Sequence, residues 1–424
     1  MHRLIVHGGR ELSGSVQISG SKNSSLPILA ATLLTKEVCV IRRVPDLSDT
    51  NYMLQILASL GAEVERASGT VTVCAETIRE SAPYELVRKM RASICVMGPL
   101  LARLHKAVVS LPGGCVIGDR PVDLHLRGLA DLGAEVAIEG GDICVSVEKE
   151  LPGGEVSLAG PHGSTVLGTD NVMMAAVLAK GRTVIEGAAA EPEVVDLANF
   201  LSSMGAKIEG AGTRRITIDG VEELHGAEHT VIPDRIEAGT FLAAGAIMGR
   251  EVTLNRVDRE HLASVIEVLE RNGCEISTTT GARGDSVTIS RASNPVGCDI
   301  LTEPYPGFPT DMQAQMCALF AFSPGVSVVT ETVFPQRFMH VAELTRMGAD
   351  IALEGPTAVL RGVEKLSGAP VMASDLRASA ALVLAGLRAE GVTEVNRLYH
   401  IDRGYEHIDD KLTGLGAEME RVKG

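Results

Sequence analysis

The chain is poor in aromatic residues and has no tryptophan. Its 424 residues include 7 phenylalanines and 5 tyrosines but 45 glycines, so a core of Ala, Val, Leu and Ile with many tight turns is expected. The 45% of hydrophobic and 22% of charged residues are typical of a folded chain, which excludes an extended disordered protein. At about 100–200 residues per domain, this length predicts two or three domains.

Long hydrophobic runs are also missing. No stretch approaches the roughly 18 apolar residues that a membrane-spanning helix needs. The first residues lack the apolar centre and the small-residue cleavage site of a signal peptide, so we expect a cytoplasmic protein that does not bind membranes.

Basic residues are outnumbered by acidic ones, 39 to 54, which gives a net charge of −15. Such a chain is a poor ligand for nucleic acid or anionic membranes, so neither is expected as a partner. Any anionic substrate must therefore be held by a local cluster of cations.

Metal and cofactor motifs are absent as well. The eight cysteines form no CxxC pair, and the histidines form no HExxH, so no metal site is predicted. No GxGxxG or GxSxG occurs, and we expect no cofactor. Eight free thiols are expected, seven of them in apolar or strand-like runs typical of buried cysteines. Cys115 alone lies in a glycine-rich, charged loop.

An internal repeat organises the chain. The pattern Leu-x-x-Leu-Gly-Ala-x-Val recurs six times with small variations, and its glycines, spaced 68–75 residues apart, are Gly61, Gly133, Gly205, Gly273, Gly348 and Gly416. Each copy predicts the end of a helix, a glycine at the C′ position with positive φ, and then a strand. Unrelated copies of a common helix–glycine–strand connection would not be so evenly spaced, so we interpret the chain as six α/β units.

The six units group as three plus three. Apolar segments rich in small residues, at 171–179, 239–248 and 377–387, predict buried helices, and β-branched strands such as 391–395 follow them. The turn-rich stretch 224–233 follows the third unit. We therefore predict two similar domains, with a ligand site in the cleft between them.

Two loops favour anion chemistry. Lys22, in Gly20-Ser-Lys-Asn23, precedes an apolar helix, whose first backbone N–H groups can help a lysine to hold an anion. This is not a Walker A loop, and a solvated lysine is the alternative. In the loop 111–121, Arg120 could lower the pKa of the Cys115 thiol and bind a phosphate. A tight turn with an incidental cysteine is the alternative there.

Other charged residues lie near predicted helix starts. The basic cluster 88–91 is compatible with an anion site or with solvated surface. Asp311 follows the breaker-rich segment 303–309, where Thr310 or Asp311 could simply be an N-cap. Asp375 with Arg377, and Asp402 with Arg403, place a carboxylate beside a guanidinium, an arrangement that structural ion pairs usually explain.

Six segments taken in chain order are more specific than any one of them: Gly20–Asn23, Met90–Ser93, Pro112–His125, Phe308–Gln313, Asp375–Ser379 and Tyr399–Glu406. Together they closely resemble the UDP-N-acetylglucosamine 1-carboxyvinyltransferases of the enolpyruvyl transferase family, from about residue 3 to the C-terminus. The resemblance implies two inside-out α/β barrel domains, each of three repeated α/β units. Residues 22–232 would form the first domain with the Cys115 loop, and 1–21 with 233–424 the second.

The resemblance also implies an activity. The enolpyruvyl group of phosphoenolpyruvate would be transferred to the 3-hydroxyl of UDP-N-acetylglucosamine by addition and elimination of phosphate. This is the first committed step of peptidoglycan synthesis and needs no metal or cofactor. The methylene carbon is protonated, the hydroxyl attacks C2, and phosphate leaves as the methyl carbon is deprotonated.

Individual roles follow from the same resemblance. The catalytic residues would be Cys115 as the acid, Asp311 as the base, and Lys22 and Arg403. Lys22, Arg120 and Arg403 would bind phosphoenolpyruvate, with Arg377 nearby. Cys115 is also the thiol that fosfomycin alkylates in the family. The remaining substrate contacts would come from Asn23, Arg91, Arg120, Pro121, Val122, Asp123, Leu124, Gly163, Ser164, Thr165, Val166, Asp311, Val333 and Asp375.

One segment departs from the family pattern. Where many members read Ser-Val-Gly-Ala-Thr-Glu-Asn, this chain reads Ser164-Thr-Val-Leu-Gly-Thr-Asp-Asn171, and some members have a lysine at the position of Gly163. Ser164 and Thr165 could replace that charged contact with hydroxyls, so a modified nucleotide sugar stays possible. Asp119 could weaken the field of Arg120.

Two other functions stay open at this point. One is the sister carboxyvinyltransferase that acts on shikimate 3-phosphate, and the other is a non-catalytic sugar-nucleotide-binding protein. The oligomeric state is also open, as a monomer or a weak oligomer.

Overall fold

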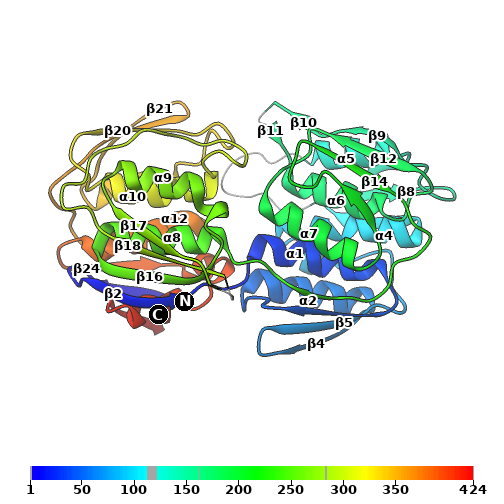
Figure 1. The fold of residues 1–424 in the computed structure, drawn as a ribbon, viewed down its shortest axis with the longest axis horizontal. Coiled ribbons are helices and arrows are strands. Elements are labelled where there is room, and N and C mark those ends of the chain that lie inside the picture. The colour runs from blue at the N-terminus through cyan, green and yellow to red at the C-terminus, as the bar shows by residue number, and fades with distance from the viewer. Residues whose placement is uncertain (1, 112–121, 162, 282–283, 424) are drawn as a thin grey trace. The chain divides into compact units, whose positions relative to one another are not determined.

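The computed structural model describes residues 2–111, 122–161, 163–281 and 284–423 (Figure 1). These residues form two compact units. Unit 1 comprises 2–19 and 233–423, and unit 2 comprises the described residues of 20–232. The chain therefore enters unit 1, forms all of unit 2, and returns to complete unit 1.

Unit 1 contains three four-stranded sheets among its described residues. In strand order they are β23 (Pro370–Met372), β24 (Val392–Asn396), β1 (His2–His7) and β25 (Glu418–Lys423); β17 (Glu275–Thr279), β18 (Asp285–Ser290), β16 (Gly249–Val257) and β2 (Leu12–Gln17); and β19 (Ile300–Leu301), β20 (Val326–Thr330), β22 (Thr357–Arg361) and β21 (Asp350–Glu354).

The helices of unit 1 are α8 (Arg235–Met248), η3 (Glu260–Leu262), α9 (Ala263–Arg271), η4 (Thr310–Met312), α10 (Gln313–Phe320), α11 (Met339–Arg346), α12 (Leu376–Arg388), η5 (Leu398–Arg403) and α13 (Ile408–Gly414).

Unit 2 repeats this construction in its described residues. Its sheets are β15 (Glu228–Thr230), β3 (Val38–Arg42), β5 (Thr70–Cys74) and β4 (Glu63–Ala67); β6 (Lys106–Ser110), β8 (Asp142–Ser146) and β7 (Glu135–Glu139); β13 (Lys207–Glu209), β14 (Arg215–Asp219), β12 (Arg182–Glu186) and β9 (Gly154–Ser157); and the short pair β10 (Ala159–Gly160) and β11 (Gly163–Ser164).

The helices of unit 2 are α1 (Lys22–Ala31), η1 (Thr32–Leu34), α2 (Ser48–Leu60), α3 (Tyr84–Val87), η2 (Arg91–Val96), α4 (Met97–Leu104), α5 (Asp123–Asp131), α6 (Val166–Ala176) and α7 (Pro192–Ser203).

One sheet topology recurs through both units, as the repeat predicts. In five of the sheets a parallel pair is followed by two antiparallel pairings, for example β9 with β12, β12 with β14, and β14 with β13. In the sixth, the isolated parallel bridge from Ser81 to Val108 takes the place of the first strand of the β6–β8–β7 sheet. In the sheet containing β24 the chain's first strand, β1, supplies the third position, so that sheet is built from the chain's two ends.

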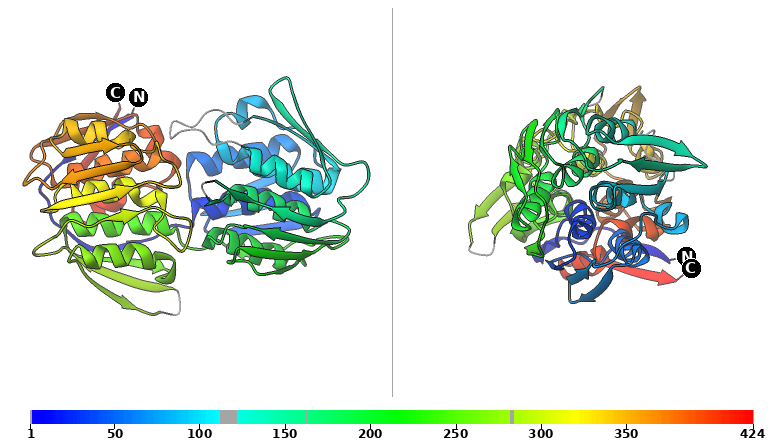
Figure 2. Two further views of the ribbon diagram at one scale, coloured as in Figure 1. Left: turned by 90° about the horizontal axis from the view of Figure 1, so that it is seen from above. Right: turned by 90° about the vertical axis from the view of Figure 1, so that its right-hand side faces the viewer.

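Helices lie inside each unit and strands lie around them (Figures 1 and 2). In unit 1, α10 is buried along its whole length, as are nearly all residues of α8 and α12. Small residues permit this packing. A Cβ on Gly239 of α8 would come within 2.7 Å of the sulfur of Met312, so a larger residue here would force Met312 to shift. The prediction that the apolar helices rich in small residues are buried is confirmed, although the helix expected at 171–179 extends from Val166 to Ala176.

The six repeat glycines have the predicted conformation. Their φ angles lie between 99° and 108°, a region that residues with a Cβ rarely adopt. Each follows the end of a helix, namely α2, α5, α7, α9, α11 or α13, and precedes a strand. Local sequence therefore determines this part of every repeat.

The seven described cysteines are all free thiols, as expected, and Cys115 lies outside the described residues. Five are buried, but Cys74 and Cys144 are only half-buried, contrary to the expectation for strand cysteines. Both lie on strands with alternating burial, where the side chains at these positions lie away from the core.

Within the described part of the chain, no helix combines the length and the apolar character that crossing a membrane requires.

Candidate active site

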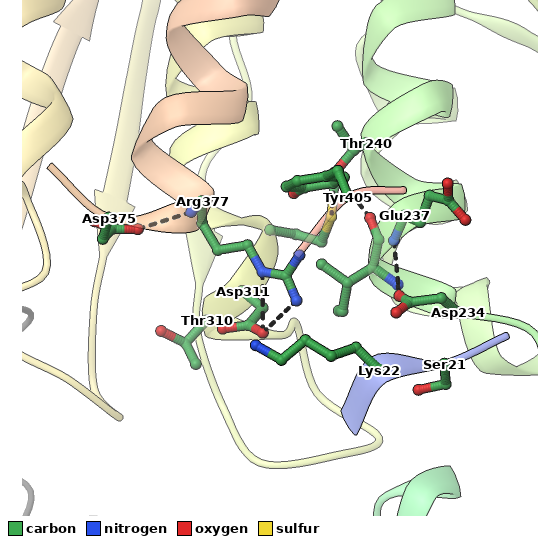
Figure 3. Close-up of polar contacts among 12 residues, drawn as sticks. Ser21, Lys22, Asp234, Glu237, Thr240, Thr310, Asp311, Asp375, Arg377 and Tyr405 are labelled. Atoms are coloured by element: carbon green, nitrogen blue, oxygen red, sulfur yellow. Dashed lines mark hydrogen bonds and ion pairs between the residues drawn. The ribbon is translucent and has the colours of Figure 1, made fainter. Parts of the chain in front are cut away.

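In unit 1, Asp311 lies at the centre of a cluster of charged residues (Figure 3). One carboxylate oxygen, Oδ1, accepts a hydrogen bond from Nη1 of Arg337 at 2.7 Å. The other, Oδ2, accepts from Nη2 and Nε of Arg377 at 3.0 and 3.2 Å. The side chain of Asp311 is 23% exposed, whereas those of Arg337 and Arg377 are 5% and 1% exposed. Two buried cations thus hold one partly accessible carboxylate.

Electrostatics keep both guanidinium groups charged. Burial alone would lower the pKa of Arg337, but Asp311 and Asp375 outweigh it and the pKa of Arg337 is raised. The pKa of Arg377 is raised as well, because Tyr405, Asp311 and Asp234 oppose the effect of burial. The cluster is therefore a fixed set of two positive charges around one negative charge, with further carboxylates close by.

The N-cap interpretation of Thr310 and Asp311 is wrong. The 3₁₀ turn η4 follows Pro309, and no side chain caps it. The carboxylate of Asp311 turns toward the two arginines instead, because its charge is satisfied there. Asp375 is the residue that caps a helix: its Oδ1 accepts from the N–H groups of Arg377 and Ala378 at 2.7 and 3.0 Å at the start of α12.

A hydroxyl network supports Arg377 from its other side (Figure 3). The guanidinium lies 5.2 Å from the ring centroid of Tyr405, a distance suited to a cation–π contact. The hydroxyl of Tyr405 is 3.0 Å from that of Thr240 on α8, and it accepts from Nε2 of Gln315 at 3.2 Å. Gln315 also donates to the backbone oxygen of Asp311 at 2.9 Å. The orientation of Arg377 is therefore determined by three segments.

Sequence analysis missed two members of this cluster, Arg337 and Glu331. Glu331 is 1% exposed and accepts from the hydroxyls of Thr302 and Thr310 and from the N–H groups of Val333 and Phe334, at 2.6–3.0 Å. It therefore holds the Val333 segment beside the start of η4. No motif marks either residue, because their side-chain partners, Thr302, Thr310 and Asp311, are 21 to 29 positions away in the chain.

Arg403 lies in η5, half-buried, next to Asp402. Asp402 pairs with Arg421 at 2.9 and 3.0 Å, and Arg377 pairs with Asp311 at 3.0 Å. Burial lowers the pKa of His400, Arg403 adds to this, and Asp375 opposes it. Arg403 and Asp375 thus both act on His400.

In unit 2, Lys22 is the first residue of α1, with Ser21 as N-cap. Its Nζ lies 2.9 Å from Oδ2 of Asp49, and the two side chains are 9% and 2% exposed. Asn23, the next residue, is half-buried. The solvated-lysine alternative is therefore wrong: the ammonium group is held in place by a buried carboxylate that the sequence did not single out.

Other predicted residues of unit 2 lie on neighbouring segments. Arg91 begins η2, so the basic cluster does not open one helix: Arg88 is at the end of α3. Val122 and Leu124 are half-buried and Asp123 is exposed at the start of α5. The side chain of Leu124 lies against Gly160, which pairs with Gly163 in the β10–β11 ladder. The segments around 122–124 and 163–166 are thus brought together.

The hydroxyl of Thr165 has a structural task. It caps α6, accepting from the N–H of Gly168 at 3.2 Å, and Ser164 and Val166 flank it half-buried. Cys115, Arg120 and Pro121 lie outside the described residues. Within the described ranges, no group of three or more His, Cys, Asp or Glu side chains is arranged to hold a metal ion.

Asp170 on α6 is a buried carboxyl group without a hydrogen bond. It is 1% exposed, and neither carboxylate oxygen has a partner in the described structure. Burial, followed by Glu193 and Glu191, raises its pKa well above the ordinary value of 3.8. In the unfolded chain this group ionises near pH 3.8, whereas in the folded protein it loses its proton only at a higher pH. The contribution of Asp170 to the free energy of unfolding is therefore fully present below pH 3.8 and is lost as the pH rises through the pKa of the folded protein.

Asp170→Asn is accordingly expected to be more stable than the wild type at pH 8. At pH 3.5–4 the two proteins should have nearly the same stability. Each kcal/mol gained corresponds to a rise in Tm of about 2–4 °C. Thermal unfolding against pH measures the difference. Asp196→Asn is the matched control, because this equally buried carboxylate does accept hydrogen bonds, from His229 at 2.8 Å and the N–H of Ile232 at 3.2 Å, and should lose stability. A lower Tm for Asp170→Asn at pH 8 would contradict the prediction.

The comparisons with known proteins cover the whole chain. Residues 6–412 match the family model described as EPSP synthase (3-phosphoshikimate 1-carboxyvinyltransferase). A UDP-N-acetylglucosamine 1-carboxyvinyltransferase from Akkermansia muciniphila is 64% identical over 422 residues, covering 100% of this chain and 99% of the relative. The protein of the same name from Methylacidiphilum infernorum is 58% identical with the same coverage.

Solved structures show the same fold. The crystal structure of the enolpyruvyl transferase NikO from Streptomyces tendae has a TM-score of 0.89 and 26% identity, covering 100% of this chain and 99% of its own. EPSP synthase from Acinetobacter baumannii has a TM-score of 0.77 and 17% identity with full coverage of both chains. The inside-out α/β architecture of three-unit repeats expected from the sequence is thus confirmed.

Proposed function

This chain belongs to the UDP-N-acetylglucosamine 1-carboxyvinyltransferases of the enolpyruvyl transferase family, and we propose that it catalyses the reaction that this name describes. It is an enzyme that transfers the enolpyruvyl group of phosphoenolpyruvate to the 3-hydroxyl of UDP-N-acetylglucosamine with release of phosphate. This reaction supplies peptidoglycan synthesis.

The identity of 64% over the whole chain with a relative of that name carries the assignment. The runner-up, an enzyme for shikimate 3-phosphate, shares the family model and the fold, but the EPSP synthase structure is only 17% identical and supports the fold alone.

In unit 1 we assign the proton transfer to Asp311. Its carboxylate lies between Arg337 and Arg377 and its side chain is 23% exposed, so it is placed to accept a proton from the sugar hydroxyl or from the methyl group of the addition intermediate. The carboxylate of phosphoenolpyruvate is an anion that the same guanidinium groups can bind.

Arg403 is proposed to bind phosphoenolpyruvate from η5, and Asp375 to keep the start of α12 in place for Arg377. Val333 is proposed to contact the sugar nucleotide, supported by its fixed position beside Glu331.

In unit 2 we assign the phosphate of phosphoenolpyruvate to Lys22, whose ammonium group is already oriented by Asp49. The sugar nucleotide is proposed to contact Asn23, Arg91, Val122, Asp123, Leu124, Gly163, Ser164, Thr165 and Val166. Cys115 as acid, with Arg120 and Pro121, completes the proposal from outside the described residues. The domain bounds of 22–232 and 1–21 with 233–424, and a substrate cleft between the domains, stay predictions.

Both substrates are charged metabolites of the cell interior, and a net charge of −15 disfavours nucleic acid. We therefore propose that the enzyme works in the cytoplasm, on these two small molecules and without nucleic acid or membranes, as a monomer or weak oligomer.

The substrate comparison tests the function directly. Purified protein is incubated with phosphoenolpyruvate and either UDP-N-acetylglucosamine or shikimate 3-phosphate, and released phosphate is measured. We expect phosphate release with UDP-N-acetylglucosamine and none with shikimate 3-phosphate. Turnover with shikimate 3-phosphate would establish the runner-up, and binding of UDP-N-acetylglucosamine without turnover would indicate the non-catalytic alternative.

Cys115→Ser is expected to abolish inactivation by fosfomycin, because the hydroxyl of serine is far less nucleophilic than a thiolate. The covalent adduct, detected as a gain in the mass of the intact protein after incubation with the inhibitor, measures this even in a variant with little activity. Cys74→Ser removes another thiol that is not fully buried and should leave inactivation unchanged. Unchanged inactivation of Cys115→Ser would refute the role assigned to this thiol.

A further inference from the structure

Asn171, in the middle of α6, connects three segments of unit 2 from a fully buried position. Its Oδ1 accepts from the N–H of Gly98 at 2.9 Å, at the start of α4. Its Nδ2 donates to the backbone oxygen of Ile94 at 3.1 Å, in η2. The same Nδ2 lies 3.1 Å from Nδ1 of His125 on α5. Every polar atom of this side chain is thus engaged.

The two backbone partners determine the positions of Oδ1 and Nδ2 in the side-chain amide of Asn171. A backbone N–H can only donate and a backbone carbonyl can only accept, so the oxygen of Asn171 must face Gly98 and the nitrogen must face Ile94. The group that meets His125 is therefore a donor. Nδ1 of His125 must accept, and the single proton of the neutral ring must lie on Nε2.

The ring is held neutral as well as oriented. His125 is 2% exposed, and burial, with a smaller effect of Arg91, lowers its pKa to about 3. A protonated ring would also place an Nδ1–H against the amide protons of Asn171. Among the described residues, His125 makes no hydrogen bond other than that with Asn171. Nε2–H is thus a neutral donor without a partner in the described chain.

The surroundings of this donor are those proposed for the sugar nucleotide. His125 directly follows Leu124, whose side chain lies against the 160–163 turn. Arg91, another proposed contact, acts on the ring from η2. A neutral N–H beside a guanidinium favours an anionic oxygen as the ligand, since both groups donate.

We propose that Asn171 is a positioning residue: it locks His125 in the neutral Nε2–H form, so that the ring donates to an anionic oxygen of the bound sugar nucleotide. The identity of this ligand rests on the proposed function, whereas the state of the ring does not. Asn171 itself touches no substrate in this proposal.

The state of the ring is tested by ¹⁵N–¹H correlation spectra of protein labelled at histidine, with the His125 signals assigned by their loss in a His125 variant. The Nε2–H tautomer is expected in the wild type at pH 7. Asn171→Asp replaces the donor with an acceptor, so Nδ1 should become protonated. Asn272→Asp is the matched control, since Asn272 is an equally buried amide in unit 1 that donates to Val296, and it should leave the His125 signals unchanged. Two results would contradict the proposal that Asn171 fixes the tautomer of His125. One is a wild-type ring protonated on Nδ1 alone, and the other is a ring that keeps the Nε2–H tautomer in Asn171→Asp.

The donor role is tested by two His125 variants that do not depend on the folding of Asn171→Asp. The amide nitrogen of glutamine can take the place of Nε2, whereas asparagine reaches only as far as Nδ1. His125→Asn is expected to raise the KM for UDP-N-acetylglucosamine about 10- to 100-fold, as loss of a hydrogen bond to a charged group should, with the KM for phosphoenolpyruvate changed less than about threefold. His125→Gln should recover most of the affinity.

Equal losses in His125→Gln and His125→Asn, or equal changes in both KM values, would overturn the donor role. Failure of the proposed function would give a different result. The wild-type protein would not bind UDP-N-acetylglucosamine, although its His125 spectrum would still show the Nε2–H tautomer.

Discussion

Asp311→Asn should lower kcat by about 10²–10⁴-fold, the usual contribution of a positioned acid or base. The carboxamide keeps the shape of the carboxylate but cannot take a proton, and it removes the negative charge between Arg337 and Arg377. Phosphate release at saturating concentrations of both substrates measures the effect. The KM values should change less than kcat, because the two guanidinium groups remain.

Asp219→Asn provides the comparison for this variant. Asp219 also accepts two hydrogen bonds from one arginine, Arg182, at 2.7 and 2.9 Å, but its side chain is 45% exposed. This change should leave kcat within about twofold, because exposed pairs contribute little. If Asp311→Asn kept more than a tenth of the wild-type kcat, Asp311 would not be the base.

Lys22→Met should lower kcat/KM for phosphoenolpyruvate about 10- to 150-fold, as expected for one charge-assisted hydrogen bond of about 1.5–3 kcal/mol. It should also destabilise unit 2. Removal of one member of a buried ion pair costs about 3–5 kcal/mol, and Asp49 is left almost fully buried without this cation.

The double variant Lys22→Met/Asp49→Asn separates these two effects. Removing both charges should recover most of the lost stability, because no uncompensated carboxylate remains from the pair. Activity should stay as low as in Lys22→Met. Denaturant unfolding and initial rates measure the two quantities on the same samples. Recovery of turnover in the double variant would show that Lys22 acts only on the fold.

The repeat was predictable because its signals are local. A glycine after the last turn of a helix, as at Gly61 or Gly416, relieves a steric conflict that involves only adjacent residues, and the same is true of the strands that follow. Burial of the inner helices was also predictable from local sequence, because helices rich in Ala, Gly and Leu have no polar face to present to water.

The site was predictable only in part. The motif around Asp311 was recognised, but its local interpretation as an N-cap failed, because Arg377, 66 positions away, satisfies the carboxylate. Arg337, Glu331 and Asp49 belong to no motif, and nothing in their immediate neighbours distinguishes them from surface residues. The same holds for Asn171, whose importance lies in its three hydrogen-bond partners.

From the residues alone, then, came the six α/β units, the positions of their turns, and the loops that resemble the enolpyruvyl transferases. These features depend on backbone sterics and hydrophobic periodicity, which act over a few positions of the chain. Which carboxylate pairs with which arginine, which lysine is buried, and which nitrogen of His125 holds its proton came from the packed structure. Charge pairing and hydrogen-bond direction depend on groups brought together across tens of residues, and folding alone makes them neighbours.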